Sequence, residues 1–347
     1  MPPPRRASFL ASRYDLRVAV FSNRSFNPHE LATTPQLSEQ DVRQLLDPHE
    51  TVAAIERAFG VEYDSFLTPS RQQIPTRDGV SLLMPCYRQA TGNLGIKFVA
   101  VAARASGSSS TVQASYVLFN TNSAEPQIFM AANWLTDLRT AATSFIASKF
   151  LARPDPGVLG VFGTGRQARA HIELFTRLSR FDAVLVCGST IQNARNFVDD
   201  LCRELNINAE PVDASRCASQ ADVICTCTTA RSPLFDGNLL RPGTHLNLVG
   251  TFQPESREVD SVTLRRARVV VDTFAGALTE AGDVLVAMNE GTIAREHIIA
   301  ELHEIVTRAK SARQSPQEIT VFKSVGCALE DLAVAELIAA KIRPQTQ

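Results

Sequence analysis

The sequence predicts an α/β protein in which a β-rich unit is followed by the alternating strands and helices of a parallel sheet. The chain has 347 residues, more than the ~250–300 at which a single core usually divides. Short strand-like segments without long helices fill residues 71–130, whereas strands and helices alternate from residue 158 onward. Strands separated by helices imply right-handed crossovers and parallel pairing in the later part.

Two helices are expected before the first strands. Ser38 is a typical N-cap residue for the first of them, and Asp47 stands before the proline that begins the second. Four strand-like segments follow, at residues 81–84, 95–101, 112–119 and 127–130. An Ala-rich helix is predicted from about Asp137 to Leu151, with Thr136 or Asp137 as its N-cap.

The second half of the chain contains the segments expected to build the parallel sheet. The predicted strands are residues 158–162, 183–187, 223–228, 246–250 and 269–272. Helices are expected near 166–178 and 192–205, and the chain closes with a strand at 320–322 and a helix near 328–341.

Gly163, Gly165 and Ala168 form a G-x-G-x-x-A turn directly between a predicted strand and a predicted helix. The first glycine permits a tight turn, and the second lets backbone N–H groups approach a pyrophosphate. The small third residue lets the helix pack closely on the strand. In isolation the pattern also fits an ordinary glycine turn, but the strand–turn–helix context favours a bound dinucleotide.

The composition excludes several classes of protein. A net charge of −1 offers no electrostatic case for nucleic acid or a membrane surface, and no apolar run approaches the ~20 residues of a membrane span. The seven cysteines lie at positions 86, 187, 202, 217, 225, 227 and 327. Their scattered spacing favours free thiols in a reducing compartment, predicts no metal site, and makes the cytoplasm the expected location.

Residues 1–36 differ from the rest of the chain. They begin with a proline run, are rich in arginine and poor in acidic residues, and contain no continuous apolar stretch of the kind found in secretory signals. The favoured interpretation is a loosely attached arm, and an organelle-targeting segment is the alternative.

Three cations are candidates for binding an anion: Arg71, Lys97 and Arg139. Lys97 shares a strand face with Val99 and Val101, where an ammonium group needs an anionic partner. Arg139 lies one turn inside its helix, where the dipole and the guanidinium would both favour a carboxylate. Each also has a simpler interpretation. Lys97 could be a lysine on an edge strand, Arg139 a solvated charge on a helix, and Arg71 a surface-loop arginine.

Short motifs recur in order along the chain. They are Met-Pro at 84–85, Gly-Ile-Lys-Phe-Val at 95–99, Asp-Leu-Arg-Thr-Ala-Ala at 137–142, Ala-Ser-Lys-Phe-Leu at 147–151, Asn-Leu-Val-Gly at 247–250, Glu-Ala-Gly-Asp-Val at 280–284, Val-Phe-Lys-Ser-Val-Gly at 321–326 and Glu-Asp at 330–331. Together with the glycine turn they resemble the ornithine cyclodeaminase/μ-crystallin family over residues 37–343. The resemblance implies a Rossmann-type NAD(P)-binding domain at 137–317, inserted in an α+β substrate-binding and dimerisation domain at 37–136 plus 318–347. It also implies a homodimer.

The resemblance implies a substrate site around an α-carboxylate. Residues matching Arg71, Lys97 and Arg139 bind that carboxylate in the family, with the match to Met84 nearby, and Lys97 and Arg139 are the expected catalytic residues. The expected cofactor contacts are Thr140, Gly163, Thr164, Gly165, Arg166, Gln167, Ala168, Ser189, Thr190, Thr228, Val249, Gly250, Ser324 and Gly326.

Two departures from the cyclodeaminase pattern bear on the reaction. Ornithine cyclodeaminases carry an aspartate where this chain has Phe252 and a glutamate where it has Leu82, so neither position offers a base. Glu255 and Glu280 remain possible carboxylates. The leading hypothesis is therefore NAD(P)H-dependent reduction of a cyclic α-imino acid, a ketimine such as Δ1-pyrroline-2-carboxylate or Δ1-piperideine-2-carboxylate, to a proline-like amino acid. The alternatives are an ornithine or lysine cyclodeaminase, an alanine-dehydrogenase-like enzyme, and an NADP-dependent binding protein of μ-crystallin type.

NADP is favoured over NAD by the end of the second strand of the parallel sheet. An NAD-preferring domain usually places Asp or Glu there to bind the ribose 2′-hydroxyl, and this chain has none at that tip. Ser189 and Thr190, with Arg195 further along, could instead bind a 2′-phosphate. The alternative is that the two hydroxyls serve only a turn and a helix N-cap.

Overall fold

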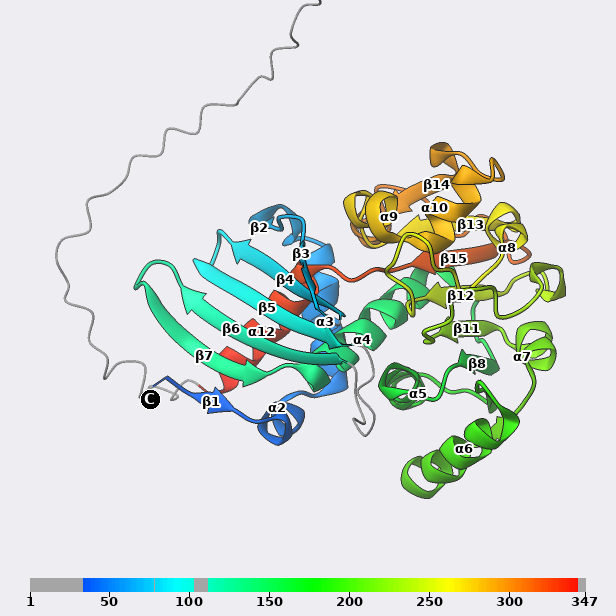
Figure 1. Cartoon of the computed structure of the whole chain (residues 1–347), viewed down its shortest axis with the longest axis horizontal. Coiled ribbons are helices and arrows are strands. Elements are labelled where there is room, and N and C mark those ends of the chain that lie inside the picture. The colour runs from blue at the N-terminus through cyan, green and yellow to red at the C-terminus, as the bar shows by residue number, and fades with distance from the viewer. Residues whose placement is uncertain (1–33, 78, 103–111, 343–347) are drawn as a thin grey trace, which may run out of the picture. The chain divides into compact units, whose positions relative to one another are not determined.

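The computed structural model describes residues 34–77, 79–102 and 112–342 (Figure 1). The chain divides by its contacts into Met1–Thr34 and Pro35–Gln347, and everything below concerns the second unit. The predicted N-terminal arm lies almost entirely outside the described residues, and its role stays a prediction.

The first part of this unit is a largely antiparallel sheet. Among the described residues it contains seven strands, in the order β1-β7-β6-β5-β4-β2, with β3 also paired to β4. The strands are β1 (Gln36–Leu37), β2 (Phe66–Leu67), β3 (Gln72–Thr76), β4 (Gly79–Arg88), β5 (Asn93–Ala102), β6 (Val112–Asn120) and β7 (Glu125–Ala131). Alternate residues of β4 and β5 are buried, so one face of the sheet forms a core.

Within the residues that the structure describes, four helices pack with this sheet or with one another beside it. They are α2 (Glu39–Leu45), α3 (Pro48–Phe59), the long α4 (Asn133–Leu151) and the C-terminal α12 (Ala328–Ile342). Helix α12 contacts β4, β5, α3 and α4, and it runs behind the sheet in Figure 1. Residues near position 330 are thereby brought beneath the strand that carries Lys97.

The second part is a fully parallel sheet. Its eight strands within the described residues follow the order β10-β9-β8-β11-β12-β15-β13-β14. They are β8 (Val158–Phe162), β9 (Ala183–Cys187), β10 (Ala209–Pro211), β11 (Val223–Thr226), β12 (His245–Leu248), β13 (Ala267–Val271), β14 (Ile298–Glu301) and β15 (Ile319–Lys323). The order reverses direction at β8, which is the switch point where α/β sheets bind nucleotides. The predicted fold class is confirmed.

The connecting helices of the parallel sheet lie between its strands in sequence. They are α5 (Arg166–Leu178), α6 (Ile191–Leu205), α7 (Ala214–Gln220), α8 (Ser261–Arg266), α9 (Phe274–Glu280), α10 (Gly282–Asn289) and α11 (Leu302–Val306). Helices α5 and α6 match the prediction closely. The short elements α7 to α11, β10 and β14 were not predicted, because segments of three to eight residues show too little periodicity.

The predicted N-cap of the Ala-rich helix is wrong. Helix α4 begins at Asn133, with Ala132 as N-cap and no side-chain cap of its own. Glu39 of α2 takes that role across the fold, since its carboxylate accepts the backbone N–H groups of Asn133, at 3.3 Å, and Trp134. A cap supplied from 94 residues away leaves no local sequence signal.

The C-terminal segment that we assign to the substrate domain contributes to both parts of the fold. β15 pairs with β12 and β13 in the parallel sheet, whereas α12 packs with the antiparallel one. The proposed domain boundaries themselves stay a prediction.

Candidate active site

A cavity of about 790 Å³ lies between the antiparallel sheet and the carboxyl ends of the parallel strands. Its walls come from β4, β5, β6, the first turns of α4 and α5, and the loops after β11, β12 and β15. The lining residues that belong to the predicted site are Arg71, Met84, Lys97, Arg139, Thr140, Gly165, Arg166, Gln167, Thr228, Val249, Gly250, Ser324 and Gly326. The structure therefore brings all four predicted substrate residues together with most of the predicted cofactor residues.

The glycine turn has the geometry that a pyrophosphate site requires. Gly163 has φ +115°, and a Cβ there would lie 2.5 Å from the carbonyl oxygen of Cys227. Gly165 differs, because a Cβ there would meet no atom within 4 Å. Gly165 is the N-cap of α5, and no side chain caps this helix. The first backbone N–H groups of α5 therefore lie next to open space without a capping side chain. These features fit a dinucleotide phosphate.

Asp137 joins the two helices that meet at this turn. Its carboxylate accepts hydrogen bonds from Arg166 Nε at 2.8 Å and from Gln167 Nε2 at 2.9 Å. Asp137 is 6% exposed, and burial raises its pKa while Arg166 opposes that rise. The ion pair fixes the start of α5 against the start of α4, which carries Arg139.

Lys97 is held by a buried carboxylate. It is 1% exposed, and its Nζ lies 2.8 Å from Asp331 Oδ1 of α12. Burial, followed by the charge of Arg139, lowers the pKa of Lys97 to about 8, and Asp331 opposes the decrease. The lysine thus remains largely cationic at neutral pH and lines the cavity opposite Met84, its register partner on β4.

Arg139 is held by the same turn of α12. Its Nη1 donates to Glu330 Oε2 at 2.6 Å, and its Nε lies 3.1 Å from Asp331 Oδ1. Burial would lower the pKa of this guanidinium, but Asp331 and Glu330 outweigh burial and raise it. Arg139 is therefore a permanent cation that lines the cavity through a 6% exposed side chain.

Arg71 reaches the cavity from the loop before β3. It donates to the carbonyl oxygen of Val325 at 3.0 Å and forms an ion pair with Glu280 of α9. Its guanidinium carbon lies 5.4 Å from the centre of the Phe252 ring. Burial lowers the pKa of Arg71 to about 10, so it too is charged at neutral pH.

Asp272, after β13, fixes the turn that follows β15. Its Oδ2 accepts from the Ser324 hydroxyl at 3.0 Å and from the backbone N–H groups of Val325 and Gly326 at 2.7 and 2.8 Å. A Cβ at Gly326, whose φ is +89°, would lie 2.9 Å from Arg139 Nη1. The turn therefore packs directly on the guanidinium of Arg139, while the carbonyl oxygen of Val325 in the same turn accepts a hydrogen bond from Arg71.

Glu258 fixes the loops after β11 and β12. Its two oxygens accept from Thr226 at 2.7 Å, from Thr228 N at 2.8 Å and from Gly250 N at 2.8 Å. It is fully buried, and burial followed by the charge of Asp283 raises its pKa. The clamp holds Thr228 and Gly250 in the cavity wall.

The cavity wall is apolar at both positions where ornithine cyclodeaminases carry an acid. Leu82 and Phe252 line it, together with Val99 of β5. Of the two other carboxylates considered from sequence, Glu280 pairs with Arg71, and Glu255 is exposed and is not among the lining residues.

Five predicted cofactor residues do not line the cavity: Gly163, Thr164, Ala168, Ser189 and Thr190. Gly163 is part of the turn itself, and Ala168 is buried in the first turn of α5. Ser189 and Thr190 are exposed at the end of β9, where Thr190 caps α6 by accepting Asn193 N at 3.1 Å. Ser189 accepts from the Asn193 side chain at 2.9 Å.

Sequence reasoning missed the acidic residues that hold the site. Glu330 and Asp331 appeared only as a family motif, and Asp272 and Glu258 were not noticed. All four are buried acids: Asp272 directly follows β13, Glu330 and Asp331 lie in the first turn of α12, and Glu258 lies in the loop between β12 and α8. The only local signal is an acid next to an apolar segment, which is also common at exposed helix ends.

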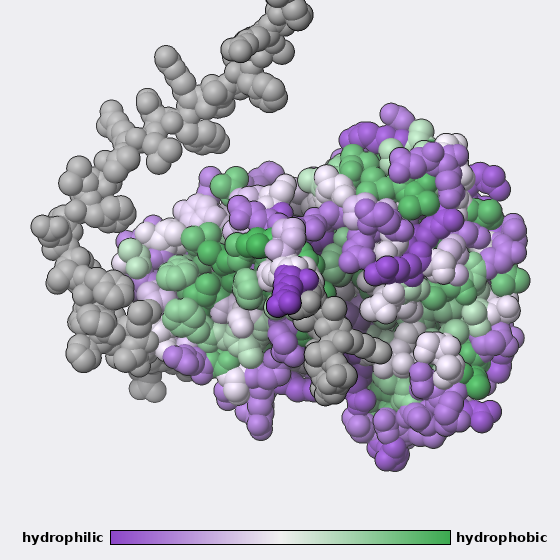
Figure 2. Space-filling view, in the orientation of Figure 1, coloured by the Kyte–Doolittle hydropathy of each residue, from purple (hydrophilic) through white to green (hydrophobic). Residues whose placement is uncertain are grey.

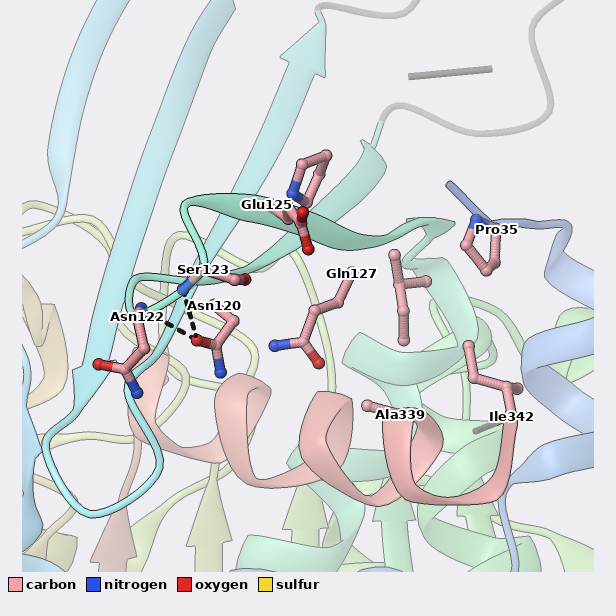
Figure 3. A pocket seen from close by; sticks show the side chains of 10 residues that line it. Pro35, Asn120, Asn122, Ser123, Glu125, Gln127, Ala339 and Ile342 are labelled. Atoms are coloured by element: carbon pink, nitrogen blue, oxygen red, sulfur yellow. Dashed lines mark hydrogen bonds between the residues drawn. The ribbon is translucent and has the colours of Figure 1, made fainter. Parts of the chain in front are cut away.

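A second cavity, of about 640 Å³, lies where the β6–β7 hairpin meets the end of α12 (Figure 3). Asn120, Gln127 and Ile342 are among its lining residues, and no residue of the predicted site lines it. Within the described ranges no group of His, Cys, Asp or Glu has the arrangement of a metal site. No helix in those ranges is long and apolar enough to cross a membrane.

Comparisons with known proteins agree with this geometry. The model of the ornithine cyclodeaminase/mu-crystallin family matches residues 34–345. A Δ1-pyrroline-2-carboxylate reductase of Bacillus cereus is 32% identical over 311 residues, which cover 88% of this chain and 95% of that protein. The ketimine reductase mu-crystallin of Mus musculus is 36% identical over 278 residues, covering 78% of this chain and 84% of that one.

A solved structure extends the likeness to three dimensions. Thermococcus litoralis Δ1-pyrroline-2-carboxylate reductase, in complex with NADH and L-proline, matches with a TM-score of 0.85 and 35% identity. The match covers 89% of this chain and 97% of that one. These relatives confirm the predicted enzyme class, an NAD(P)-dependent oxidoreductase. The chain belongs to the ornithine cyclodeaminase/mu-crystallin family.

Proposed function

We propose that this protein uses NAD(P)H to reduce a cyclic α-imino acid, such as Δ1-pyrroline-2-carboxylate or Δ1-piperideine-2-carboxylate, to a proline-like amino acid. One observation carries the proposal. Three cations, the buried Lys97 and Arg139 and the partly buried Arg71, line the same cavity as the start of the dinucleotide-binding helix. A small anionic substrate would be held there beside the cofactor. The Bacillus, mouse and Thermococcus relatives, named for this kind of reaction, support it.

The cations would fix the substrate by its carboxylate. Arg139 and Lys97 are held from behind by α12, so their charges are already oriented before binding. Arg71 is held separately, by its hydrogen bond to the carbonyl oxygen of Val325 and its ion pair with Glu280. Such preorganisation places the α-carbon and supplies much of what a positioning enzyme contributes.

The rest of the wall suits a hydrocarbon ring. Leu82, Val99 and Phe252 offer no hydrogen-bonding side chain to a second polar group. They also exclude water from the reacting carbon. An iminium needs no strong base, and these three side chains provide none.

The cofactor's nicotinamide supplies the hydride when bound. Gly165, Arg166 and Gln167 would hold the phosphates at the start of α5, and Ser324 and Gly326 lie on the side expected to face the nicotinamide. We propose NADP(H) as the preferred form because the exposed residues after β9, Ser189 and Thr190, include no acid, and Arg195 is exposed in the first turns of α6. An Arg195→Ala variant should then lose affinity for NADPH but not for NADH.

The assay is NADPH absorbance with five- and six-membered cyclic imino acids. A parallel reaction supplies ornithine or lysine with catalytic NAD and measures ammonia. NADPH consumption in the first and no ammonia in the second is the expected result. Ammonia release without imine reduction would favour a cyclodeaminase. Tight NADPH binding without turnover of any imino acid would favour a binding protein of μ-crystallin type.

We also propose that the chain forms a homodimer through the outer face of its antiparallel sheet. The side chains of this face are partly or fully exposed and mostly apolar; they include Leu83, Tyr87, Leu94, Ile96, Phe98, Val117, Phe119 and Phe129. Figure 2 shows hydrophobic residues gathered over these strands. Exposed apolar surface of this extent is typical of an interface. The cytoplasm remains the expected location, supported by seven free cysteines.

A further inference from the structure

Around the two buried cations of the proposed site, buried carboxylates outnumber the cations. Lys97 and Arg139 are 1% and 6% exposed. Asp331 contacts both, Glu330 contacts Arg139, and Asp272 lies close enough to act on Glu330 electrostatically. Glu330 and Asp331 are 0% exposed and Asp272 is 1% exposed. With all five groups ionised, the carboxylates outnumber the cations by one.

The third cation of the cavity does not alter this balance. Arg71 is paired with Glu280 of α9, so the two add one positive and one negative charge to the count. A substrate carboxylate would therefore enter a site that holds no spare positive charge. A further unpaired charge in a buried site costs several kcal/mol, and titratable groups usually neutralise instead.

Of the three carboxylates, Glu330 has the fewest interactions that stabilise its ionised form. Asp331 bonds to Lys97 and faces Arg139, and Asp272 accepts three donors on one oxygen. Glu330 has one charged partner, Arg139 Nη1 at 2.6 Å, and one long contact from the backbone N–H of Cys327 at 3.3 Å. A substrate carboxylate on Arg139 would compete for that one charged partner.

On the basis of the proposed function, we propose that Glu330 takes up a proton from solvent when the substrate carboxylate binds beside Arg139. The proton keeps the buried cluster from gaining a second excess negative charge. Glu330 is then a positioning residue whose protonation state changes with binding, while Asp331 keeps Lys97 and Arg139 in place.

The charges around Glu330 set the pH range of this uptake. Burial raises the pKa of Glu330 to about 7; Arg139 opposes the increase, and Asp272 and Asp331 add to it. Lys97 is the other cation that acts on it. In the free enzyme Glu330 is mostly ionised above pH 7 and protonated well below it. A bound carboxylate weakens the effect of Arg139 and raises the pKa further, so uptake is largest above pH 7 and disappears toward pH 5.

The test is calorimetric binding of pyrrole-2-carboxylate to the NADPH complex at pH 8, in buffers of different ionisation enthalpy. This planar five-membered carboxylate cannot accept hydride. The wild-type protein should take up at least about one proton per ligand bound, from Glu330 and in part from Lys97. Pyrrole-2-carboxamide, which has no charge, should cause no uptake.

Two variants of α12 separate Glu330 from a general effect of the helix. Because the pKa of Lys97 is about 8, Lys97 also contributes to the uptake at pH 8, so Glu330→Gln should take up about one proton fewer per ligand than the wild type. Glu336 lies on the same helix as Glu330 and is paired with Arg88 of β4. The Glu336→Gln variant should retain the uptake. Uptake in the Glu330→Gln variant equal to that of the wild type, or none in the wild type, would overturn the proposal.

A measurement on the wild type covers the case in which Glu330→Gln does not fold. The dissociation constant of pyrrole-2-carboxylate should be flat below pH 6 and rise about tenfold per pH unit above pH 7. A constant value from pH 6 to 8.5 would refute the proposal. The proposed function is tested separately: proton-linked binding without turnover of any imino acid would leave this inference intact and remove the reductase.

Discussion

Lys97 is the residue on which the proposed chemistry depends most. Its ammonium group is buried, paired with Asp331 and exposed only to the cavity. Replacing it with methionine keeps the size and removes the charge, so the substrate carboxylate loses a charged hydrogen bond. Lys97→Met should lower kcat/KM for the imino acid at least about a hundredfold while NADPH affinity stays within about threefold.

Lys149→Met is the matched control for this prediction. Lys149 lies on α4, pairs with Glu56 and is 42% exposed, away from the cavity. Its loss should leave kcat/KM unchanged, as is usual for surface pairs. Full activity of Lys97→Met in the same steady-state assay would disprove the assignment of the carboxylate site.

Single residues were predicted from sequence where an unusual chemical type met a regular pattern. A lysine on an apolar strand face and an arginine within a helix were visible in this way, and both line the cavity. Glu330 appeared only within a family motif and Glu258 was not identified, because an acid next to an apolar segment is also common at an exposed helix end. Their importance comes from partners 191 and 32 residues away.

His171 gives the stability of the protein a pH dependence at the scale of one side chain. It is fully buried, Nδ1 bonds to the carbonyl of Gln167 at 2.7 Å and Nε2 to Ser144 at 3.0 Å. Burial lowers its pKa to about 4 from the ordinary 6.5. Below pH 6.5 the unfolded chain therefore binds a proton that the folded protein does not, and stability decreases as pH falls.

This loss is best measured as a difference between proteins. From pH 7 to 5 the wild type should lose about 2 kcal/mol of unfolding free energy relative to His171→Asn. Denaturant unfolding at several pH values measures it. The same substitution at the exposed His49 should leave the pH dependence unaltered. Parallel pH profiles for wild type and His171→Asn would contradict the assignment.

At the scale of elements, the glycine turn before α5 allows a clean separation of folding from cofactor binding. Gly165→Ala adds a methyl group where no atom lies within 4 Å, so thermal stability should not change. Where a phosphate occupies that space, the methyl group obstructs it. The dissociation constant for NADPH, measured by fluorescence, should rise at least about tenfold.

Gly163→Ala should behave differently. Its φ of +115° and the 2.5 Å approach to Cys227 make the alanine destabilising, by about 1–3 kcal/mol, before any cofactor is added. For Gly165→Ala, NADPH binding as tight as that of the wild type would contradict the prediction that the dinucleotide phosphate lies against this turn.

Long elements were predictable and short or remotely supported ones were not. The strand before the glycine turn and helix α5 agree with the prediction because their periodicity extends over a strand and several turns. The start of α4 was misplaced because its cap is Glu39, and helices α7 to α11 are too short for a clear pattern. Sequence motifs therefore predicted the residues that line the cavity better than the residues that hold the surrounding helices and loops in place.

At the scale of the whole molecule, the antiparallel sheet has an apolar outer face for which we propose a second copy as the partner. Phe98 on this face is 44% exposed, although its neighbours Lys97 and Val99 point into the core. Phe98→Glu should convert the dimer into a monomer in analytical ultracentrifugation. Val61→Glu, at a 93% exposed position, should not. A wild type that is monomeric at micromolar concentration would contradict the dimer.

The most direct test of the account is a crystal structure of the protein with NADPH and pyrrole-2-carboxylate. We predict the nicotinamide in the cavity between the two sheets and the ligand's carboxylate within hydrogen-bonding distance of Lys97 and Arg139. A carboxylate bound elsewhere, or a dinucleotide that does not contact the start of α5, would contradict the account.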